Sequence, residues 1–122
     1  MVTYLYVALG GSIGALLRYL LSGWVQQAAG GLFPWGTLAV NVLGSFFLGF
    51  LYEAALSGAV SPELRVFLAI GLLGSFTTFS TLSYETLAFL RDGAVGWALF
   101  YALGSLVLGV LAALFGVWLG GR

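Results

Sequence analysis

Uncharged, mostly apolar stretches make up nearly the whole chain. They cover residues 1 to 17, 19 to 52, 66 to 84 and 93 to 121. About 20 apolar residues in a helix cross a hydrocarbon core of about 30 Å, and the second stretch is long enough for parts of two spans. The pattern therefore predicts an all-α membrane protein, a single four-span domain over the whole chain. The predicted spans are about 2–22, 35–56, 63–90 and 95–119.

The segments between the predicted spans carry turn signals. Residues 23–34 contain two glutamines, paired glycines and a proline, which predict a turn or a short interfacial segment. Ser61 is placed to be an N-cap, with Pro62 at the first helical position. Gly58 and Gly93 are placed to end the second and third helices. The connections are therefore expected to be short.

Composition narrows the class of protein further. The chain is 61% hydrophobic and 7% charged, and it contains no Lys, His or Cys, whereas a soluble domain carries about 25% charged residues. The net charge of zero provides no basic patch for nucleic acid. These values exclude a soluble globular domain, a disordered segment and a nucleic-acid binder. The scattered carboxylates, with no base to activate a nucleophile, argue against an enzyme.

The arginines are divided evenly between the two sides of the membrane. With four spans, Arg65 and Arg122 lie on the side of the termini, and Arg18 and Arg91 on the other. The positive-inside bias then specifies neither orientation. We expect insertion in both orientations, which allows an antiparallel pair with a two-fold axis in the membrane plane. The alternative is that so few arginines are evenly distributed by chance.

Polar and small residues recur at every fourth position in two spans. These repeats are Thr37, Asn41, Ser45 and Gly49 in the second span, and Tyr101, Ser105 and Gly109 in the fourth. Such stripes are most often helix-packing seams, which is also our interpretation of Gly10 and Gly14. The amide of Asn41 needs partners for both its donors and its acceptor, so this residue fits either interhelical bonding or a substrate contact.

The third span combines glycine with many hydroxyl residues. Gly74 lies near its midpoint, and Thr77 and Thr78 follow. This favours a broken helix, whose freed carbonyls could hold a small cation and whose half-helix N-terminus could attract an anion. The alternative is a continuous helix whose hydroxyls bond to carbonyls one turn earlier.

Three motifs occur in order along these spans. They are Gly10-Gly-Ser-Ile-Gly-Ala-Leu-Leu-Arg-Tyr19, Trp35-Gly-Thr-Leu-Ala-Val-Asn41 with Gly44-Ser-Phe46, and Gly71-Leu-Leu-Gly-Ser-Phe-Thr-Thr-Phe-Ser-Thr81. Over essentially the whole chain, the sequence resembles the Fluc (CrcB-type) fluoride channels. The resemblance implies an antiparallel homodimer with two pores in the inner cell membrane, passive export of fluoride from the cytoplasm, and a structural sodium ion at the dimer centre.

The resemblance also implies roles for individual residues. The fluoride pore would contain Asn41, Phe79, Ser80, Thr81, Tyr101 and Ser105. The approaches to the pore would be lined by Arg18 and Glu85, although snorkelling near a span end is an alternative for Arg18. The sodium ion would be held by the backbone carbonyls of Gly74 and Thr77. Phe79 would present its positive ring edge to the anion.

One residue departs from the family pattern. Leu82 stands where the second pore phenylalanine is expected, so a ring edge is missing or is supplied by Phe76 or Tyr84. Gly109 also stands where a further hydroxyl is expected. These departures leave open whether the chain pairs with itself or with a different homologue.

Two other functions are alternatives to a channel. A small multidrug-type proton antiporter would need a carboxylate in the first span, where Arg18 is the only charge. A structural or assembly subunit of a larger membrane complex would need only the packing stripes. For a passive channel, a negative-inside potential favours anion exit by about 2.3 kcal/mol per 100 mV.

Overall fold

A computed structural model describes all 122 residues and consists of four long helical spans. Three spans are single helices, α1 (Val2–Ala29), α2 (Trp35–Leu56) and α6 (Val95–Gly120). The third span is divided into α3 (Pro62–Arg65), the π-helix η1 (Val66–Leu73), α4 (Gly74–Phe76) and α5 (Phe79–Arg91). Each of the four is long and apolar enough to cross a membrane. The expectation of an all-helical protein with four spans and a broken third helix is confirmed.

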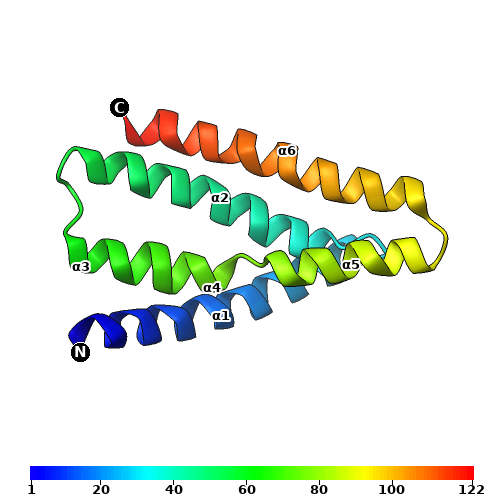
Figure 1. Cartoon of the computed structure of the whole chain (residues 1–122), viewed down its shortest axis with the longest axis horizontal. Coiled ribbons are helices and arrows are strands. Elements are labelled where there is room, and N and C mark those ends of the chain that lie inside the picture. Colours follow the sequence, from blue (N-terminus) through cyan, green and yellow to red (C-terminus); the bar gives the residue numbers. More distant parts are fainter.

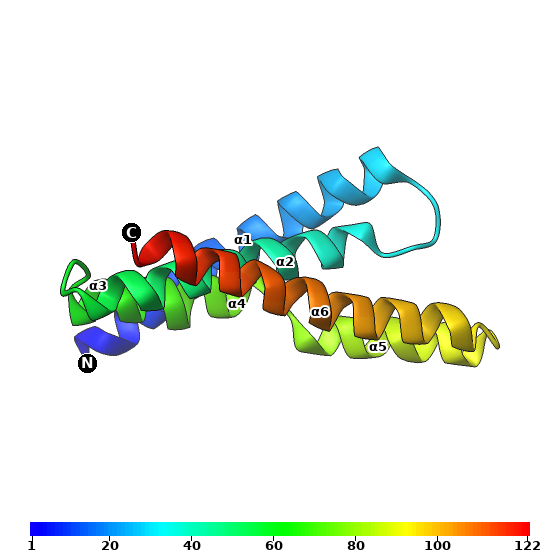
Figure 2. The same ribbon diagram turned by 90° about the horizontal axis from the view of Figure 1, so that it is seen from above.

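The spans run alternately up and down, so both termini lie at the same end of the molecule (Figure 1). At the opposite end the molecule is splayed, with α1 and the start of α2 diverging from α5 and α6 (Figure 2). The end of α4 and the start of α5 lie near the middle of the molecule's length (Figure 1). The break in the third span is therefore far from both ends.

Glycines let the helix backbones approach closely. A Cβ on Gly10 or Gly14 of α1 would overlap the carbonyl oxygens of Phe67 and Leu72. The predicted packing role of Gly10 and Gly14 is thus confirmed, and η1 is the helix they contact. Gly116 of α6 lies in the same way against the backbone of α2. The small hydrophobic core lies around the third span and contains Val40, Leu51, Ala69, Leu73 and Phe76.

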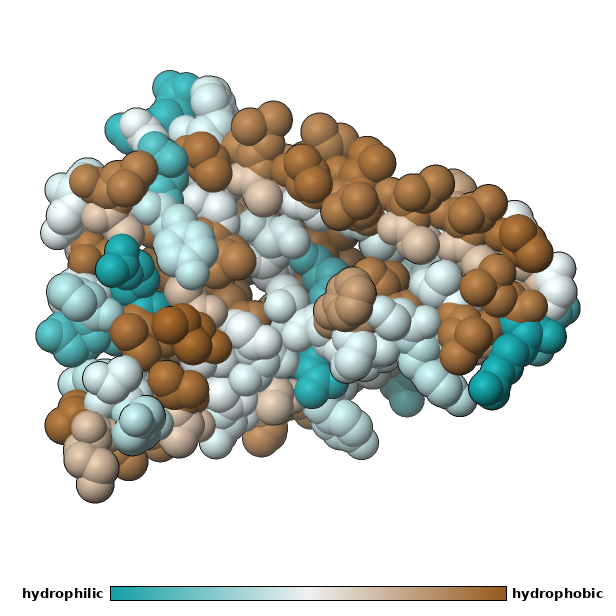
Figure 3. Space-filling view, viewed as in Figure 1, coloured by the Kyte–Doolittle hydropathy of each residue, from teal (hydrophilic) through white to brown (hydrophobic).

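Most large apolar side chains point outward. Hydrophobic residues cover the edge of the molecule formed by α6 (Figure 3), where Leu103, Leu106 and Leu114 are all exposed. Such continuous exposure is far greater than a protein in water tolerates and suits contact with lipid chains. The molecule is a multi-pass membrane protein.

The first connection differs from the expectation. We predicted that the first span ends at about residue 22, but α1 continues to Ala29. Gln26, interpreted above as a turn residue, lies in the helix, and its side chain bonds the backbone of the following loop. The true turn is confined to the residues after Ala29, where Gly30 and Gly31 adopt φ angles of 69° and 77°.

The other two connections agree with the sequence. The Ser61 hydroxyl accepts a hydrogen bond of 3.1 Å from the backbone N–H of Leu64, with Pro62 at the start of α3. Gly58 and Gly93 have φ angles of 82° and 77°, a conformation that favours glycine at a helix end. The predicted caps are confirmed.

Candidate functional site

The third span is interrupted at two threonines. Thr77 and Thr78 have extended backbones, with ψ angles of 160° and 120°. The Thr78 hydroxyl accepts from the backbone N–H of Thr81 at 3.2 Å and so caps the new helix α5. Gly74 is itself helical. The break lies at the two threonines that follow it, where the Thr78 hydroxyl provides the cap.

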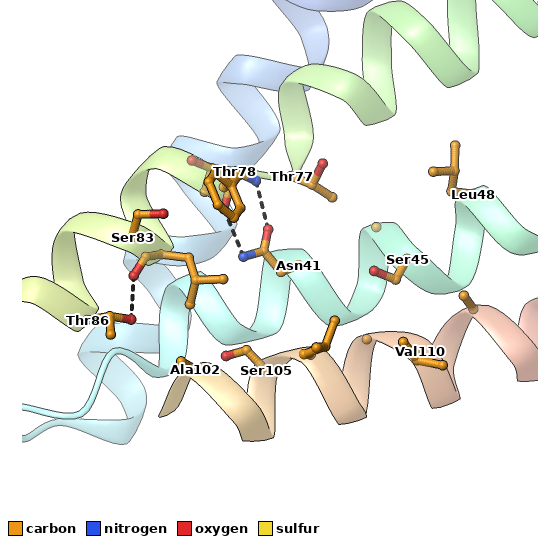
Figure 4. A pocket seen from close by; sticks show the side chains of 16 residues that line it. Asn41, Ser45, Leu48, Thr77, Thr78, Ser83, Thr86, Ala102, Ser105 and Val110 are labelled. Carbon is orange, nitrogen blue, oxygen red and sulfur yellow. Dashed lines mark hydrogen bonds between the residues drawn. The ribbon is translucent and has the colours of Figure 1, made fainter. Parts of the chain in front are cut away.

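Asn41 of α2 bonds the backbone at the break. Its Oδ1 accepts from the Thr78 N–H at 2.7 Å, and its Nδ2 donates to the Thr78 carbonyl at 3.1 Å. Both bonds are drawn in Figure 4. The extended backbone of Thr78 forms no helical hydrogen bonds, and the Asn41 amide bonds its N–H and carbonyl instead. One hydrogen on Nδ2 is left over from this pair of bonds.

The break diverts the usual donors away from two carbonyl oxygens. In a continuous helix, the N–H of Thr78 would donate to Gly74 and that of Thr81 to Thr77. Here the first donates to Asn41 and the second to the Thr78 hydroxyl. The Gly74 and Thr77 oxygens are therefore free of their helical donors, at the C-terminal end of a half-helix. Neutral carbonyls in such a place suit a small cation, so the predicted pair fits a sodium ion.

Arg18 lies beside the same break. Its Nε donates to the Ser75 carbonyl at 3.0 Å, from a half-buried position on α1. In a continuous helix, Ser75 would accept from the N–H of Phe79 instead. The guanidinium therefore satisfies a carbonyl at the negative end of the half-helix. This position gives Arg18 a bonded partner in the middle of the molecule, in addition to any role at the approach to a pore.

Glu85 joins three helices. Its two carboxylate oxygens accept from the Tyr101 hydroxyl of α6 at 2.7 Å and from the Thr37 hydroxyl of α2 at 3.1 Å. Tyr101 and Thr37 are both buried. Two hydroxyl donors partly compensate a carboxylate in a place where ionised groups are costly. Tyr101, predicted to belong to the pore track, is thus bonded to Glu85.

A groove of 760 Å³ lies between α2, α5 and α6 and begins at the break. Figure 4 shows its polar members, Asn41 and Ser45 on α2, the two threonines of the break, Ser83 and Thr86 on α5, and Ser105 on α6. The Ser105 hydroxyl is buried and has no hydrogen-bond partner. A buried hydroxyl without a protein partner is uncommon, and it is a candidate donor to a bound water or ligand.

The structure brings together some of the predicted pore residues and not others. Asn41, Phe79 and Ser105 line the groove, and Ser80, Thr81 and Tyr101 do not. Sequence reasoning missed the groove-lining residues Ser45, Thr78, Ser83 and Thr86. Ser45 stood in the four-residue repeat of the second span, so the signal for it was present but was interpreted as packing.

Leu82 lines the groove where the family pattern has phenylalanine. Neither ring considered as a substitute lines the groove. Phe76 is buried in the core, and Tyr84 is 65% exposed on the outer surface of α5. Phe79, which is 81% exposed, is the one phenylalanine among the lining residues.

Comparison with known proteins agrees with this architecture. The chain matches the family described as CrcB-like protein, Camphor Resistance (CrcB), over residues 5–117. It belongs to this CrcB family. A CrcB relative from one strain of Thermus thermophilus, named fluoride-specific ion channel FluC, is 61% identical over 118 residues, which cover 97% of this chain and 93% of the relative.

Further CrcB relatives carry the same name. The FluC of a second strain of Thermus thermophilus is 59% identical over 118 residues, 97% of this chain and 94% of the relative. The FluC of Geobacter sulfurreducens is 50% identical over 121 residues, 98% of this chain and 94% of the relative. The resemblance inferred from the three motifs is confirmed, and it extends over nearly the whole chain.

Proposed function

We propose that this CrcB protein is a passive, fluoride-selective channel through which fluoride leaves the cytoplasm across the inner membrane. The observation that carries the proposal is the groove at the broken helix, with an unpartnered Ser105 hydroxyl opposite Asn41. Its polar lining is neutral, made of amide, hydroxyl and backbone groups. The relatives named as fluoride-specific channels support the choice of ion.

Neutral donors suit an ion that must be released as well as bound. Fluoride holds its water tightly, so a pore must replace that water with several donors without trapping the ion. The second amide hydrogen of Asn41, the Ser105 hydroxyl and the exposed ring edge of Phe79 are three such donors. A mid-pore arginine would bind the anion more tightly and slow its release.

The groove of one chain is open along one side, and we propose that an antiparallel second copy closes it. Phe79 is 81% exposed although it lines the groove, so one wall is incomplete in the single chain. The balanced arginines support the opposite orientation of the second copy. Two copies would form two pores, one at each groove.

The carbonyls of Gly74 and Thr77 are the proposed sodium ligands at the centre of this dimer. Gly74 is exposed on the surface of the single chain, where a second copy could approach it. Each chain would contribute two neutral oxygens to the shared ion, whose charge would draw the two half-helix ends together.

Efflux from liposomes tests the channel. Liposomes containing the purified protein are loaded with potassium fluoride or potassium chloride, a potassium ionophore is added to carry the balancing charge, and release is followed with an ion-selective electrode. We expect rapid loss of fluoride with chloride retained, and no loss from empty liposomes. Retention of fluoride by liposomes that contain a folded dimer would overturn the proposal. Equal loss of both ions would overturn selectivity.

Thr77 variants test the cation site. Thr77→Ser keeps the backbone and the hydroxyl bond to the Leu73 carbonyl, which is 3.1 Å long. Thr77→Pro removes the backbone N–H that donates to the same carbonyl at 3.1 Å and disfavours the helical conformation of Phe76. We expect sodium to raise the melting temperature of the wild type and of Thr77→Ser but not of Thr77→Pro. The same response in all three would contradict the proposed ligands.

A further inference from the structure

The loop between α1 and α2 places a half-buried aromatic ring against α6 at the splayed end. The Phe33 ring meets the ring of Tyr101 edge-on, with centroids 5.4 Å apart and planes at 82°. It also contacts the rings of Trp35, Trp97 and Phe100, at 4.6, 5.9 and 6.0 Å. Phe33 is thus the centre of an aromatic cluster that joins this loop to α2 and α6.

Side-chain bonds fix the loop in this position. The Gln26 Nε2 donates to the Phe33 carbonyl at 3.0 Å, and its Oε1 accepts from the Gly36 N–H at 3.0 Å. Gly30 and Gly31 supply the left-handed conformations that turn the chain back. One glutamine therefore ties the end of α1, the ring-bearing residue and the first turn of α2 together.

The hydroxyl group of Tyr101 bonds the carboxylate of Glu85. Tyr101 is 1% exposed and its hydroxyl donates to Glu85 at 2.7 Å, so its ring is held between Phe33 and the carboxylate. Glu85 is bonded to Thr37 of α2 and Tyr101 of α6. Each of these partners lies four residues, one helical turn on the same face, from a residue that lines the groove, Asn41 and Ser105 respectively. The charge of this carboxylate is thus about one helical turn beyond the proposed path of an anion.

We infer that Phe33 is a positioning residue for ion conduction, which keeps the Tyr101 hydroxyl on Glu85 and so limits the repulsion between this carboxylate and a passing anion. This inference rests on the proposed channel function. If the ring is lost, Tyr101 gains freedom, one oxygen of Glu85 loses its donor, and the less compensated charge raises the barrier for fluoride.

Substitution of the ring tests the inference by fluoride efflux. We expect Phe33→Leu to slow efflux about 2- to 10-fold, the range given by the loss of one well-oriented aromatic pair. Phe33→Tyr keeps the ring and should restore most of the rate. Leu32→Ala, a change at a 96% exposed neighbour in the same loop, is the matched control and should leave the rate unchanged. Wild-type efflux from Phe33→Leu would overturn the inference.

A double-mutant cycle separates positioning from a general structural effect. If Phe33 acts through Tyr101, then Phe33→Leu should have no further effect on efflux in a Tyr101→Phe background. Additive losses would overturn the inference. If Phe33→Leu fails to fold, Gln26→Glu gives the second test, because it removes the donor to the Phe33 carbonyl and keeps the acceptor. Absence of efflux from the wild type would instead overturn the channel function itself.

Discussion

Asn41 shows how a single amide can serve both structure and transport. The sequence left two interpretations open, an interhelical bond or a substrate contact. The structure shows that Asn41 forms two hydrogen bonds to the backbone of Thr78 and also lines the groove. The two interpretations are compatible because a carboxamide has two donor hydrogens, and the bond to the Thr78 carbonyl uses one of them.

Asn41→Asp should therefore impair both the break and the pore. A carboxylate cannot donate to the Thr78 carbonyl, and its charge would repel the anion. Loss of a buried hydrogen bond costs about 1–3 kcal/mol, so we expect fluoride efflux to fall about tenfold or more. Ser12→Ala in α1 is the control, since this exposed hydroxyl donates only to the Ala8 carbonyl of its own helix. Unchanged efflux from Asn41→Asp would remove this residue from the pore.

Ser105→Ala should affect flux without harming the fold. The hydroxyl has no protein partner, so its removal breaks no hydrogen bond and should leave the melting temperature equal or slightly higher. If the hydroxyl donates to fluoride, efflux should fall about 2- to 10-fold. Thr86→Ala is the matched comparison, because that groove hydroxyl already donates to the Leu82 carbonyl at 2.8 Å. A larger loss of flux from Thr86→Ala would contradict the role of Ser105.

At the scale of the helices, the π-helical segment and the glycines facing it explain how α1 approaches the third span. The backbone of α1 at Gly10 and Gly14 lies directly against η1. Arg18 lies one turn further along α1, at the Ser75 carbonyl. The close approach at the glycines therefore sets the distance at which the arginine meets the end of the half-helix.

Gly14→Ala tests this contact against a matched glycine in the same helix. The new methyl group would overlap the Leu72 carbonyl, so we expect a loss of about 1–3 kcal/mol in stability. Gly23→Ala meets nothing within 4 Å and should instead stabilise α1 by about 0.5–1 kcal/mol. Thermal unfolding in detergent measures both. Equal melting temperatures for the two variants would contradict the close contact between α1 and η1.

Local signals in the sequence predicted the helices better than the contacts between them. Ser61, Gly58 and Gly93 lie where the sequence placed them, because caps depend on neighbours in the chain. Gln26 was misinterpreted because its side chain bonds a loop that folds back on it, which the sequence does not show. The break lies at the threonines that the sequence indicated, but its partner Asn41, 37 residues away along the chain, is a contact that the sequence does not show.

The site was predictable in its residue types and less so in its geometry. Asn41, Phe79 and Ser105 were identified by resemblance and lie together in one groove. The grouping of Glu85 with Thr37 and Tyr101 was not foreseen, since it depends on the packing of three helices. Tyr101 and Thr37 do lie in the two polar stripes, so the stripes indicated which surfaces face inward.

At the scale of the whole molecule, the even distribution of arginine predicts a mixed population of orientations. Ser57 lies on the exposed loop at the same end as both termini, and the chain has no native cysteine. Labelling of Ser57→Cys in intact cells with a membrane-impermeant thiol reagent should therefore reach about half of the molecules. Permeabilised cells, in which the reagent reaches both sides, supply the complete signal.

An added arginine tests whether this mixture matters for conduction. Adding Ala59→Arg on the same loop changes the bias from two against two to three against two, which should move the Ser57→Cys loop to the cytoplasmic side and lower labelling in intact cells. If pores form between oppositely oriented copies, the rarer orientation limits the number of dimers. Fluoride efflux from these cells should therefore fall as the number of chains in that orientation falls. Fluoride efflux that stays constant while labelling becomes one-sided would show that the chains pair in parallel or conduct singly. That result would overturn the antiparallel dimer but would leave the groove of each chain as the path of the ion.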